Sequence, residues 1–424
     1  MSYKPKNRIY LCLAHMSEAG LEQKYIKEAF DTNWVAPLGP NVNGFEKDLE
    51  EFVNGVKVPE LVEGPTNNDG VSTGSTTCLN KRVVALSSCT AAIHLALLEL
   101  GVGSGDEVLC QSFSFCASTN PVVYCGARPV FVDSEKDTWN IDPDLLETAI
   151  QDRIATTGKT PKAIIVVDLY GMPAKWDELE QIASRYNIPI IEDAANALGS
   201  FYKGRPCGSF GEIATYSFNG NKIITTSGGG ALVCKDDETK RKAVFLATQA
   251  KEPCLHYEHQ TIGFNYRMSN VCAGIGRGQM TVLQEHVDHH RHVHQLYTEL
   301  LDGVAVHANP SEQYESNFWL TTITFPKELD VEALCRTLDA AGIEARPLWK
   351  PMHKQPVYRG VESLEFRVES LPNGIVRQTS DRSVAYINGV SESLFKVGMC
   401  LPSGPYVTDE DVHYIVDCIK EAME

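Results

Sequence analysis

A single lysine stands between a polar turn and three consecutive glycines near the middle of this 424-residue sequence. Residues 217–222 are Ser-Phe-Asn-Gly-Asn-Lys, and glycines occupy positions 228–230. Glycine lets the backbone approach a neighbouring group closely, and lysine is the side chain that forms Schiff bases with aldehyde cofactors. Lys222 is therefore a candidate for cofactor attachment; the alternative is a hairpin that carries an exposed lysine.

A carboxylate follows an apolar run at residues 190–197, Ile-Ile-Glu-Asp-Ala-Ala-Asn-Ala. Asp193 comes just after the predicted strand and just before small residues. A carboxylate beneath a pyridine nitrogen keeps that nitrogen protonated and makes the ring an electron sink. The alternative is an Asp193 that caps a following helix.

Small polar residues also open a helix-like run at residues 87–92, Ser-Ser-Cys-Thr-Ala-Ala. The N–H groups at a helix N-terminus bind phosphate, although serine and threonine are also ordinary helix caps. Phe115 follows another predicted strand and could stack on a planar cofactor; the alternative is a core phenylalanine.

Strand-like and helix-like runs alternate around these residues. Strands are predicted at residues 83–86, 107–110, 129–132, 163–167 and 188–191, and helices at residues 91–100, 142–151 and 176–186. This alternation predicts an α/β fold with a mostly parallel sheet. Ligands bind beyond the carboxyl ends of such strands, where Asp168, Asp193 and the turn at residues 87–90 all fall.

The pattern changes after residue 279 to a long helical run at residues 280–301. A strand at 319–325 and a helix at 331–341 follow it. We expect residues 1–301 to form an N-terminal segment and a large domain, and residues 302–424 to form a smaller C-terminal α/β domain.

Three histidines in the long helical run, His286, His290 and His294, share one helical face because of their four-residue spacing. A zinc site would also require a carboxylate or cysteine as third ligand. We therefore predict a solvated helix face and no metal.

The formal net charge is −17, with 55 acidic against 38 basic residues. This charge argues against a nucleic-acid or membrane surface. The 13 cysteines are scattered without a C-x-x-C pair, which favours reduced thiols and a cytoplasmic location. The apolar run at residues 9–13 is too short for a signal peptide or a membrane span.

Taken together, these segments resemble the DegT/StrS sugar aminotransferases, a family of fold-type-I enzymes that use pyridoxal phosphate (PLP). The resemblance covers nearly the whole chain, with motifs at residues 33–40, 88–92, 192–195, 217–222, 263–269, 346–353 and 400–404. The Asn-Gly-Asn-Lys and Arg-Pro-Leu-Trp-Lys-Pro-Met-His wording is similar to that of the subgroup acting on UDP-4-keto-6-deoxy-N-acetylhexosamines, as in bacillosamine-type pathways.

The resemblance implies a role for each matching residue. Lys222 would carry the cofactor and move the substrate proton, while Asp193 would pair with the ring nitrogen. The other implied cofactor contacts are Ser88, Cys89, Thr90 and Ser217 around the phosphate, Phe115 on the ring, Asn196 at the phenolic oxygen, and Asn265 reaching the phosphate from the partner of a homodimer. The implied contacts to the sugar nucleotide are Arg267, Trp349 and His353.

The sequence departs from the family pattern in three places. Cys89 stands where the family usually has glycine, and the segments at residues 56–82 and 361–385 are longer than usual. Cys89 can still offer its backbone N–H to phosphate, but the turn must accept a Cβ atom.

The implied reaction transfers an amino group from L-glutamate to a keto-sugar nucleotide in two half-reactions at one site, which predicts ping-pong kinetics. The alternatives are a PLP-dependent sugar dehydratase, in which histidine replaces the lysine, and a non-catalytic protein of the same fold, which would lose Lys222 or Asp193. An NAD enzyme is disfavoured because no G-x-G-x-x-G motif follows an early strand.

Overall fold

The structure is a computed structural model, and it describes residues 3, 5, 7–55, 80–327, 329–359 and 367–423. The long segment noted at residues 56–82 lies outside the described residues except for its last three positions. Residues 361–366 of the second long segment lie outside them as well.

The main feature is a ten-stranded mixed sheet whose six central strands run parallel. Its order is β1 (Arg82–Leu86), β9 (Gly230–Cys234), β8 (Ile213–Ser217), β5 (Ile190–Asp193), β4 (Ala163–Val167), β2 (Glu107–Gln111), β3 (Arg128–Val132), β16 (Val384–Ile387), β15 (Val376–Thr379) and β14 (Arg367–Ser370). β1 and β9 are antiparallel additions at one edge, and β15 and β14 at the other. The mostly parallel sheet expected from the sequence is therefore present.

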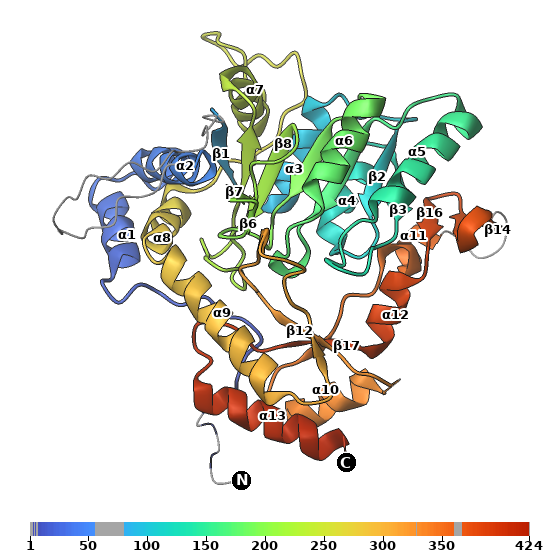
Figure 1. Cartoon of the computed structure of the whole chain (residues 1–424). Coiled ribbons are helices and arrows are strands. Elements are labelled where there is room, and N and C mark those ends of the chain that lie inside the picture. Colours follow the sequence, from blue (N-terminus) through green and yellow to red (C-terminus); the bar gives the residue numbers. More distant parts are fainter. Residues whose placement is uncertain are drawn as a thin grey trace, which may run out of the picture.

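Helices cover both faces of this sheet (Figure 1). Ile164 and Val166 of β4 face one hydrophobic core, whereas Ala163 and Ile165 face the other. This burial on both sides explains why β4 is a continuous apolar run rather than an alternating one. The first core is covered by α2 (Pro40–Val53), α5 (Pro143–Thr157) and α6 (Trp176–Tyr186), and the second by α3 (Cys89–Glu99), α4 (Asn120–Tyr124) and α7 (Asp237–Ala247).

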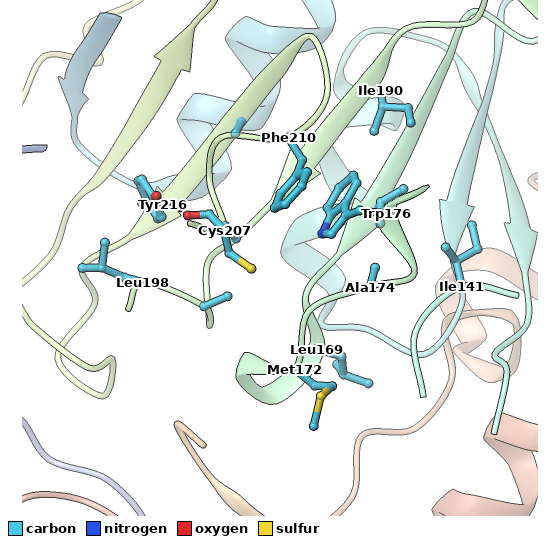
Figure 2. Packing of buried hydrophobic residues seen from close by; sticks show 14 of the residues in the cluster. Ile141, Leu169, Met172, Ala174, Trp176, Ile190, Leu198, Cys207, Phe210 and Tyr216 are labelled. Atoms are coloured by element: carbon cyan, nitrogen blue, oxygen red, sulfur yellow. Dashed lines mark hydrogen bonds between the residues drawn. The ribbon is translucent and has the colours of Figure 1, made fainter. Parts of the chain in front are cut away.

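Aromatic packing fixes α6 against the sheet. Trp176 at the start of α6 stacks on Phe210, with ring centroids 4.7 Å apart and planes only 5° from parallel (Figure 2). Trp176 also donates its indole N–H to Asp168, at 3.1 Å. The helix is thus held both by apolar contact and by a buried carboxylate at the end of β4.

A second, smaller sheet lies below the large one in Figure 1 and is entirely antiparallel. Its order is β10 (Ala305–Val306), β12 (Thr321–Thr324), β17 (Gly398–Leu401) and β13 (Arg346–Pro347). Its core is shared with α9 (Leu283–Leu300), α10 (Val331–Ala340) and α13 (Asp409–Met423). The chain enters this unit through α8 (Asn270–Met280) and α9, while α1 (Leu21–Asp31) packs against α8.

The C-terminal part of the chain contributes to both sheets. Strands β14 to β16 join the large sheet, with β16 parallel to β3, before α12 (Val390–Val397) leads back to β17. A short three-stranded sheet, β11 (Tyr314–Glu315), β6 (Phe201–Tyr202) and β7 (Arg205–Pro206), adds a further link. The division of the chain at residues 301 and 302 stays a prediction.

The histidine face of α9 is buried, so the predicted solvated face is wrong. His290 is fully buried, and His286 and His294 are nearly so. The ring of His286 bonds the carbonyl of Ile223 at 3.0 Å, and His294 stacks on Phe318 with centroids 3.6 Å apart. The spacing correctly placed the three rings on one face, but that face packs on other loops, and burial lowers the pKa of His290 to about 3.

None of the helices in the described part of the chain has the length and apolar character needed to cross a membrane.

Candidate active site

A cavity of about 570 Å³ opens at the edge of the large sheet where the parallel strands end. Val167, Asp193 and Ser217 are the last residues of β4, β5 and β8, and all three line it. The antiparallel neighbours contribute at the same edge, because β9 starts there and β1 ends there. Nine of the predicted site residues line this one cavity: Ser88, Cys89, Thr90, Phe115, Asp193, Asn196, Ser217, Lys222 and Trp349.

Lys222 lies in the loop that joins β8 to β9. These strands are antiparallel neighbours, so the hairpin alternative describes the connection correctly, but the amine turns into the cavity. Its Nζ donates to Oδ1 of Asn196 at 2.5 Å and lies 3.8 Å from the ring centroid of Trp319. Burial lowers the pKa of Lys222 to about 8, although the Asp193 carboxylate acts in the opposite direction. Roughly a tenth of the amine is therefore neutral, and nucleophilic, at pH 7, far more than for an ordinary lysine.

Asp193 is buried at the end of β5 and does not cap a helix, since the next element is β6. Its carboxylate accepts hydrogen bonds from the Ser118 hydroxyl at 2.6 Å and from the backbone N–H of Ala195 at 3.1 Å. Burial raises the pKa of Asp193, and the bond from Ser118 opposes that rise. A buried carboxylate of this kind favours a cationic partner such as a protonated ring nitrogen.

The N-terminus of α3 opens toward the same cavity. Ser88 caps the helix by accepting from the N–H of Ala91 at 3.1 Å, so the ordinary capping role is present as well. Cys89 is the first helical residue and turns its thiol inward, 3.5 Å from the hydroxyl of Thr215. The neighbouring strand β9 must lack a side chain at this point, because a Cβ added to Gly230 would lie 2.3 Å from the backbone nitrogen of Cys89. Glycine at 230 is thus what lets the helix terminus come so close to the sheet.

These groups fit PLP. An amine and a carboxylate share a cavity with the N-terminus of a helix, where N–H groups and the hydroxyls of Thr90 and Ser217 could receive a phosphate. Phe115 is 56% exposed on the cavity wall and could cover a planar ring. The aldehyde, ring nitrogen and phosphate of the cofactor would each meet a matching group.

Several cavity residues were missed by the sequence analysis: Leu11, Cys12, Leu13, Ser118, Trp319, Glu344, Arg346 and Cys400. Arg346 lies within a motif quoted for the family resemblance, and it pairs with Glu344 at 2.9 Å. Glu344 also accepts from the backbone N–H of Leu11 at 3.1 Å, which brings the N-terminal segment to the cavity. Arg346 and Cys400 could have been found, because both lie within quoted motifs, whereas the contact between Leu11 and Glu344 joins residues 333 positions apart and has no local signal.

Three predicted residues lie outside the cavity lining. Asn265 is exposed and forms a backbone bridge with Thr248. The guanidinium of Arg267 is buried against Glu46 at 2.6 Å and also donates to the carbonyl of Ala85. His353 is buried with its ring between the Ser112 hydroxyl, at 2.6 Å, and the Glu392 carboxylate, at 3.0 Å. Within this chain, the polar atoms of Arg267 and His353 that were expected to bind the sugar nucleotide bond to other protein groups.

A model of the DegT/DnrJ/EryC1/StrS aminotransferase family matches residues 75–420. The chain is 44% identical over 419 residues to EpsN of Bacillus subtilis (strain 168), whose naming as a pyridoxal phosphate-dependent aminotransferase is itself provisional, and the match covers 97% of this chain and 95% of EpsN. It is 32% identical over 409 residues to the GDP-perosamine synthase of Caulobacter vibrioides (strain ATCC 19089 / CIP 103742 / CB 15), covering 95% of this chain and 96% of the synthase. A crystal structure of a DegT DnrJ EryC1 StrS aminotransferase from Brucella abortus superposes with a TM-score of 0.78 at 27% identity over 95% of both chains.

Proposed function

Because the chain belongs to the DegT/DnrJ/EryC1/StrS aminotransferase family, we propose that it transfers an amino group from L-glutamate to a keto-sugar nucleotide. Membership confirms the resemblance predicted from the motifs, together with the fold-type-I architecture and PLP as the cofactor. We propose UDP-4-keto-6-deoxy-N-acetylhexosamine as the acceptor, because the sequences of residues 219–222 and 346–353 resemble the motifs of the subgroup that acts on such sugars.

The observation that carries the proposal is the amine of Lys222 in one cavity with the buried carboxylate of Asp193. A sugar dehydratase of this family would have histidine in place of the lysine. A non-catalytic relative would have no need for a desolvated amine whose pKa is lowered to about 8. The position of this amine therefore favours an aminotransferase over both alternatives.

When bound, PLP supplies an aldehyde and an electron-accepting ring. Lys222 holds the cofactor and, when its amine is free, moves the proton at the substrate carbon that carries nitrogen. Asp193 would hold the proton on the ring nitrogen, and Phe115 would lie against the ring. Thr90, Ser217 and the N-terminus of α3 would hold the phosphate.

Arg346 and Trp349 are proposed to receive the sugar nucleotide at the cavity wall. Arg346 is the more exposed of the two, with 65% of its side chain accessible, so it can reach an anionic group such as a diphosphate. The Trp349 ring stands 5.6 Å from that of Phe115 and offers a flat surface to a sugar or a base.

We also propose a cytoplasmic homodimer with shared active sites. Asn265, expected to reach the phosphate of the partner's site, is exposed at the end of a surface loop. Apolar side chains are fully open on that loop, with Leu255, Tyr257 and Ile262 each more than 80% exposed. Large apolar side chains that are this exposed on one loop favour burial against a second subunit.

The test is incubation of the purified protein with PLP, L-glutamate and a panel of 4-keto and 3-keto sugar nucleotides carrying UDP or GDP, followed by mass spectrometry of the products. We expect an amino sugar from a 4-keto UDP-sugar, with 2-oxoglutarate formed in equal amount. Amination of a GDP-sugar alone would replace the proposed nucleotide, and no amination with any acceptor would refute the function. A colourless protein that does not respond to added PLP would refute it at an earlier step.

A further inference from the structure

Two side chains from different parts of the fold hold the amine of Lys222. Asn196 comes from the loop after β5 and accepts from Nζ at 2.5 Å. Trp319 comes from the segment just before β12 and places its ring 3.8 Å from the same atom. Trp319 also donates its indole N–H to the carbonyl of Asn221, at 2.6 Å, so it contacts the lysine loop twice. The position of the amine therefore depends on the spacing between Asn196 and Trp319.

That spacing is bridged by one buried amide, the side chain of Asn317. Its Nδ2 donates to the carbonyl of Asn196 and to the carbonyl of Leu198, both at 2.9 Å. Its Oδ1 accepts the backbone N–H of Trp319, also at 2.9 Å. Asn317 is fully buried, and both N–H groups and the oxygen of its amide are used. The residue joins the two contacts of Lys222 without lining the cavity itself.

The surroundings of Asn317 leave no room for another arrangement. Gly171 has a φ of 95°, and a Cβ added there would lie 1.9 Å from Oδ1 of Asn317. The hydroxyl of Ser200 donates to the carbonyl of Gly171 at 2.7 Å and accepts the backbone N–H of Asn317 at 2.9 Å. The Asn317 amide is therefore held by its own hydrogen bonds and by close contact with Gly171, while Ser200 holds its backbone. A residue that sets the spacing of two loops needs such a fixed position.

We propose that Asn317 is a positioning residue, which sets the distance between Asn196 and Trp319 and so holds the free amine of Lys222 toward the cavity. The inference rests on the proposed function, in which Lys222 is alternately bonded to the cofactor and released from it. Lysine has a long flexible stem, and a displacement of about 1 Å at a reacting group costs on the order of 10²-fold in rate. A released amine thus needs contacts that keep it in place until it bonds again.

The test measures the amine directly, in the full-length protein after removal of bound cofactor. Lys222 is acylated with a small amine-reactive acylating reagent, and the rate of acylation is measured at a series of pH values by peptide mass spectrometry. In the wild-type protein the midpoint is expected near pH 8. In Asn317→Ala, water is expected to reach the unpaired carbonyls of Asn196 and Leu198 and to solvate the amine, which moves the midpoint upward by at least about one pH unit toward that of ordinary lysine.

A matched control is Asn270→Ala. Asn270 is also a buried amide that bridges two backbone segments, donating to the carbonyl of Trp34 at 3.0 Å and accepting the backbone N–H of Asn41 at 2.9 Å. It does not line the cavity. We expect this variant to lose stability while leaving the Lys222 midpoint unchanged. If the midpoint in Asn317→Ala does not rise, or rises no further than in Asn270→Ala, the proposal is overturned.

Two further variants keep the test decisive if Asn317→Ala folds poorly. Asn317→Leu keeps a similar volume and adds no charge but loses both N–H donations and the acceptor for Trp319, so it is expected to raise the midpoint too. Trp319→Leu should raise it, and adding Asn317→Ala to Trp319→Leu should give less than the sum of the two shifts, because the residues act through one contact. Additive shifts would mean that Asn317 acts independently of Trp319 and would overturn the proposal.

Failure of the proposed function is recorded separately. Borohydride reduction of the protein with PLP, followed by peptide mass spectrometry, reports whether Lys222 takes up the cofactor. If the wild-type protein takes up none, the proposed function fails, whereas the acylation midpoints still decide the role of Asn317.

Discussion

Lys222 and Arg267 are two cations that the sequence placed in the same site, and the structure gives them opposite surroundings. The guanidinium of Arg267 pairs with the carboxylate of Glu46 at 2.6 Å, and both side chains are at most 10% exposed. The ammonium of Lys222 meets neutral groups, the amide oxygen of Asn196 and the ring of Trp319. It has no ion-pair partner within 4 Å in the part of the chain that the structure describes.

The difference shows how a fold separates reactive cations from structural ones. A carboxylate in contact compensates the cost of burying a charge and keeps the group charged. Neutral contacts compensate that cost only in part, so the lysine loses its proton more easily and its pKa falls to about 8. Lys222 thus has the lowered pKa that the proposed chemistry needs, whereas Arg267 links α2 to β1, the strand that precedes the turn at residues 87–90.

The largest expected effect is that of Lys222→Ala. The variant should lose covalent attachment of PLP completely, since no other amine is placed in the cavity among the described residues. Absorbance of the purified protein and mass spectrometry after borohydride reduction measure it. Lys222→Arg is the control, because it keeps a cation but not the nucleophile; attachment in either variant would contradict the assignment.

Asp193→Asn should have the next largest effect. The amide keeps the shape of the carboxylate but cannot hold the ring nitrogen in its protonated form, so the rate of the glutamate half-reaction should fall roughly 10²-fold or more. Stopped-flow absorbance of the holoenzyme measures that rate. Covalent attachment of PLP should persist, since Lys222 is intact, and an unchanged rate would remove Asp193 from the proposed chemistry.

Arg267→Met should act on stability instead. Removing one partner of a buried ion pair costs about 3 kcal/mol, here moderated because Lys240 remains 3.3 Å from Glu46. Urea unfolding gives the free energy, and covalent attachment of PLP should be retained. The double variant Glu46→Gln/Arg267→Met, which removes both charges, should lose less than the sum of the single losses. A stability equal to that of the wild type would make Arg267 available for another role.

Glu392→Gln should have the smallest effect and the clearest dependence on pH. Hydrogen bonds from His353 and Lys354 lower the pKa of Glu392 to about 2, from 4.5. Because the pKa is lower in the folded state, the ionised carboxylate stabilises the fold above pH 4.5, and this contribution disappears as the pH falls toward 2. Glu392 is 28% exposed, so the loss at pH 7 should be about 1 kcal/mol or less. Urea unfolding at pH 7 and at pH 3.5 checks it; a difference in unfolding free energy that grows in acid would contradict the lowered pKa of Glu392 in the folded state.

Periodic segments were predicted most closely. β4 and α6 have the predicted bounds, because a run buried on both faces and an amphipathic helix are local properties of the chain. The long helix was predicted at residues 280–301, but α8 ends at Met280 and α9 begins at Leu283, after a two-residue turn that the pattern did not mark. The prediction of a solvated histidine face was wrong because the spacing of residues defines a helix face but not what packs against it.

By itself, the sequence determined the alternating order of elements, the placement of Asp193 and of the turn at residues 87–90 at strand ends, and the lysine between a polar turn and glycines. These are local consequences of side-chain periodicity and backbone freedom. The tertiary structure alone decided which cations have partners and which residues hold the amine: Arg267 meets Glu46 across 221 positions, and Asn317 meets Asn196 across 121. Charge compensation depends on distances of a few ångströms between residues far apart in the chain, and no local pattern encodes those distances.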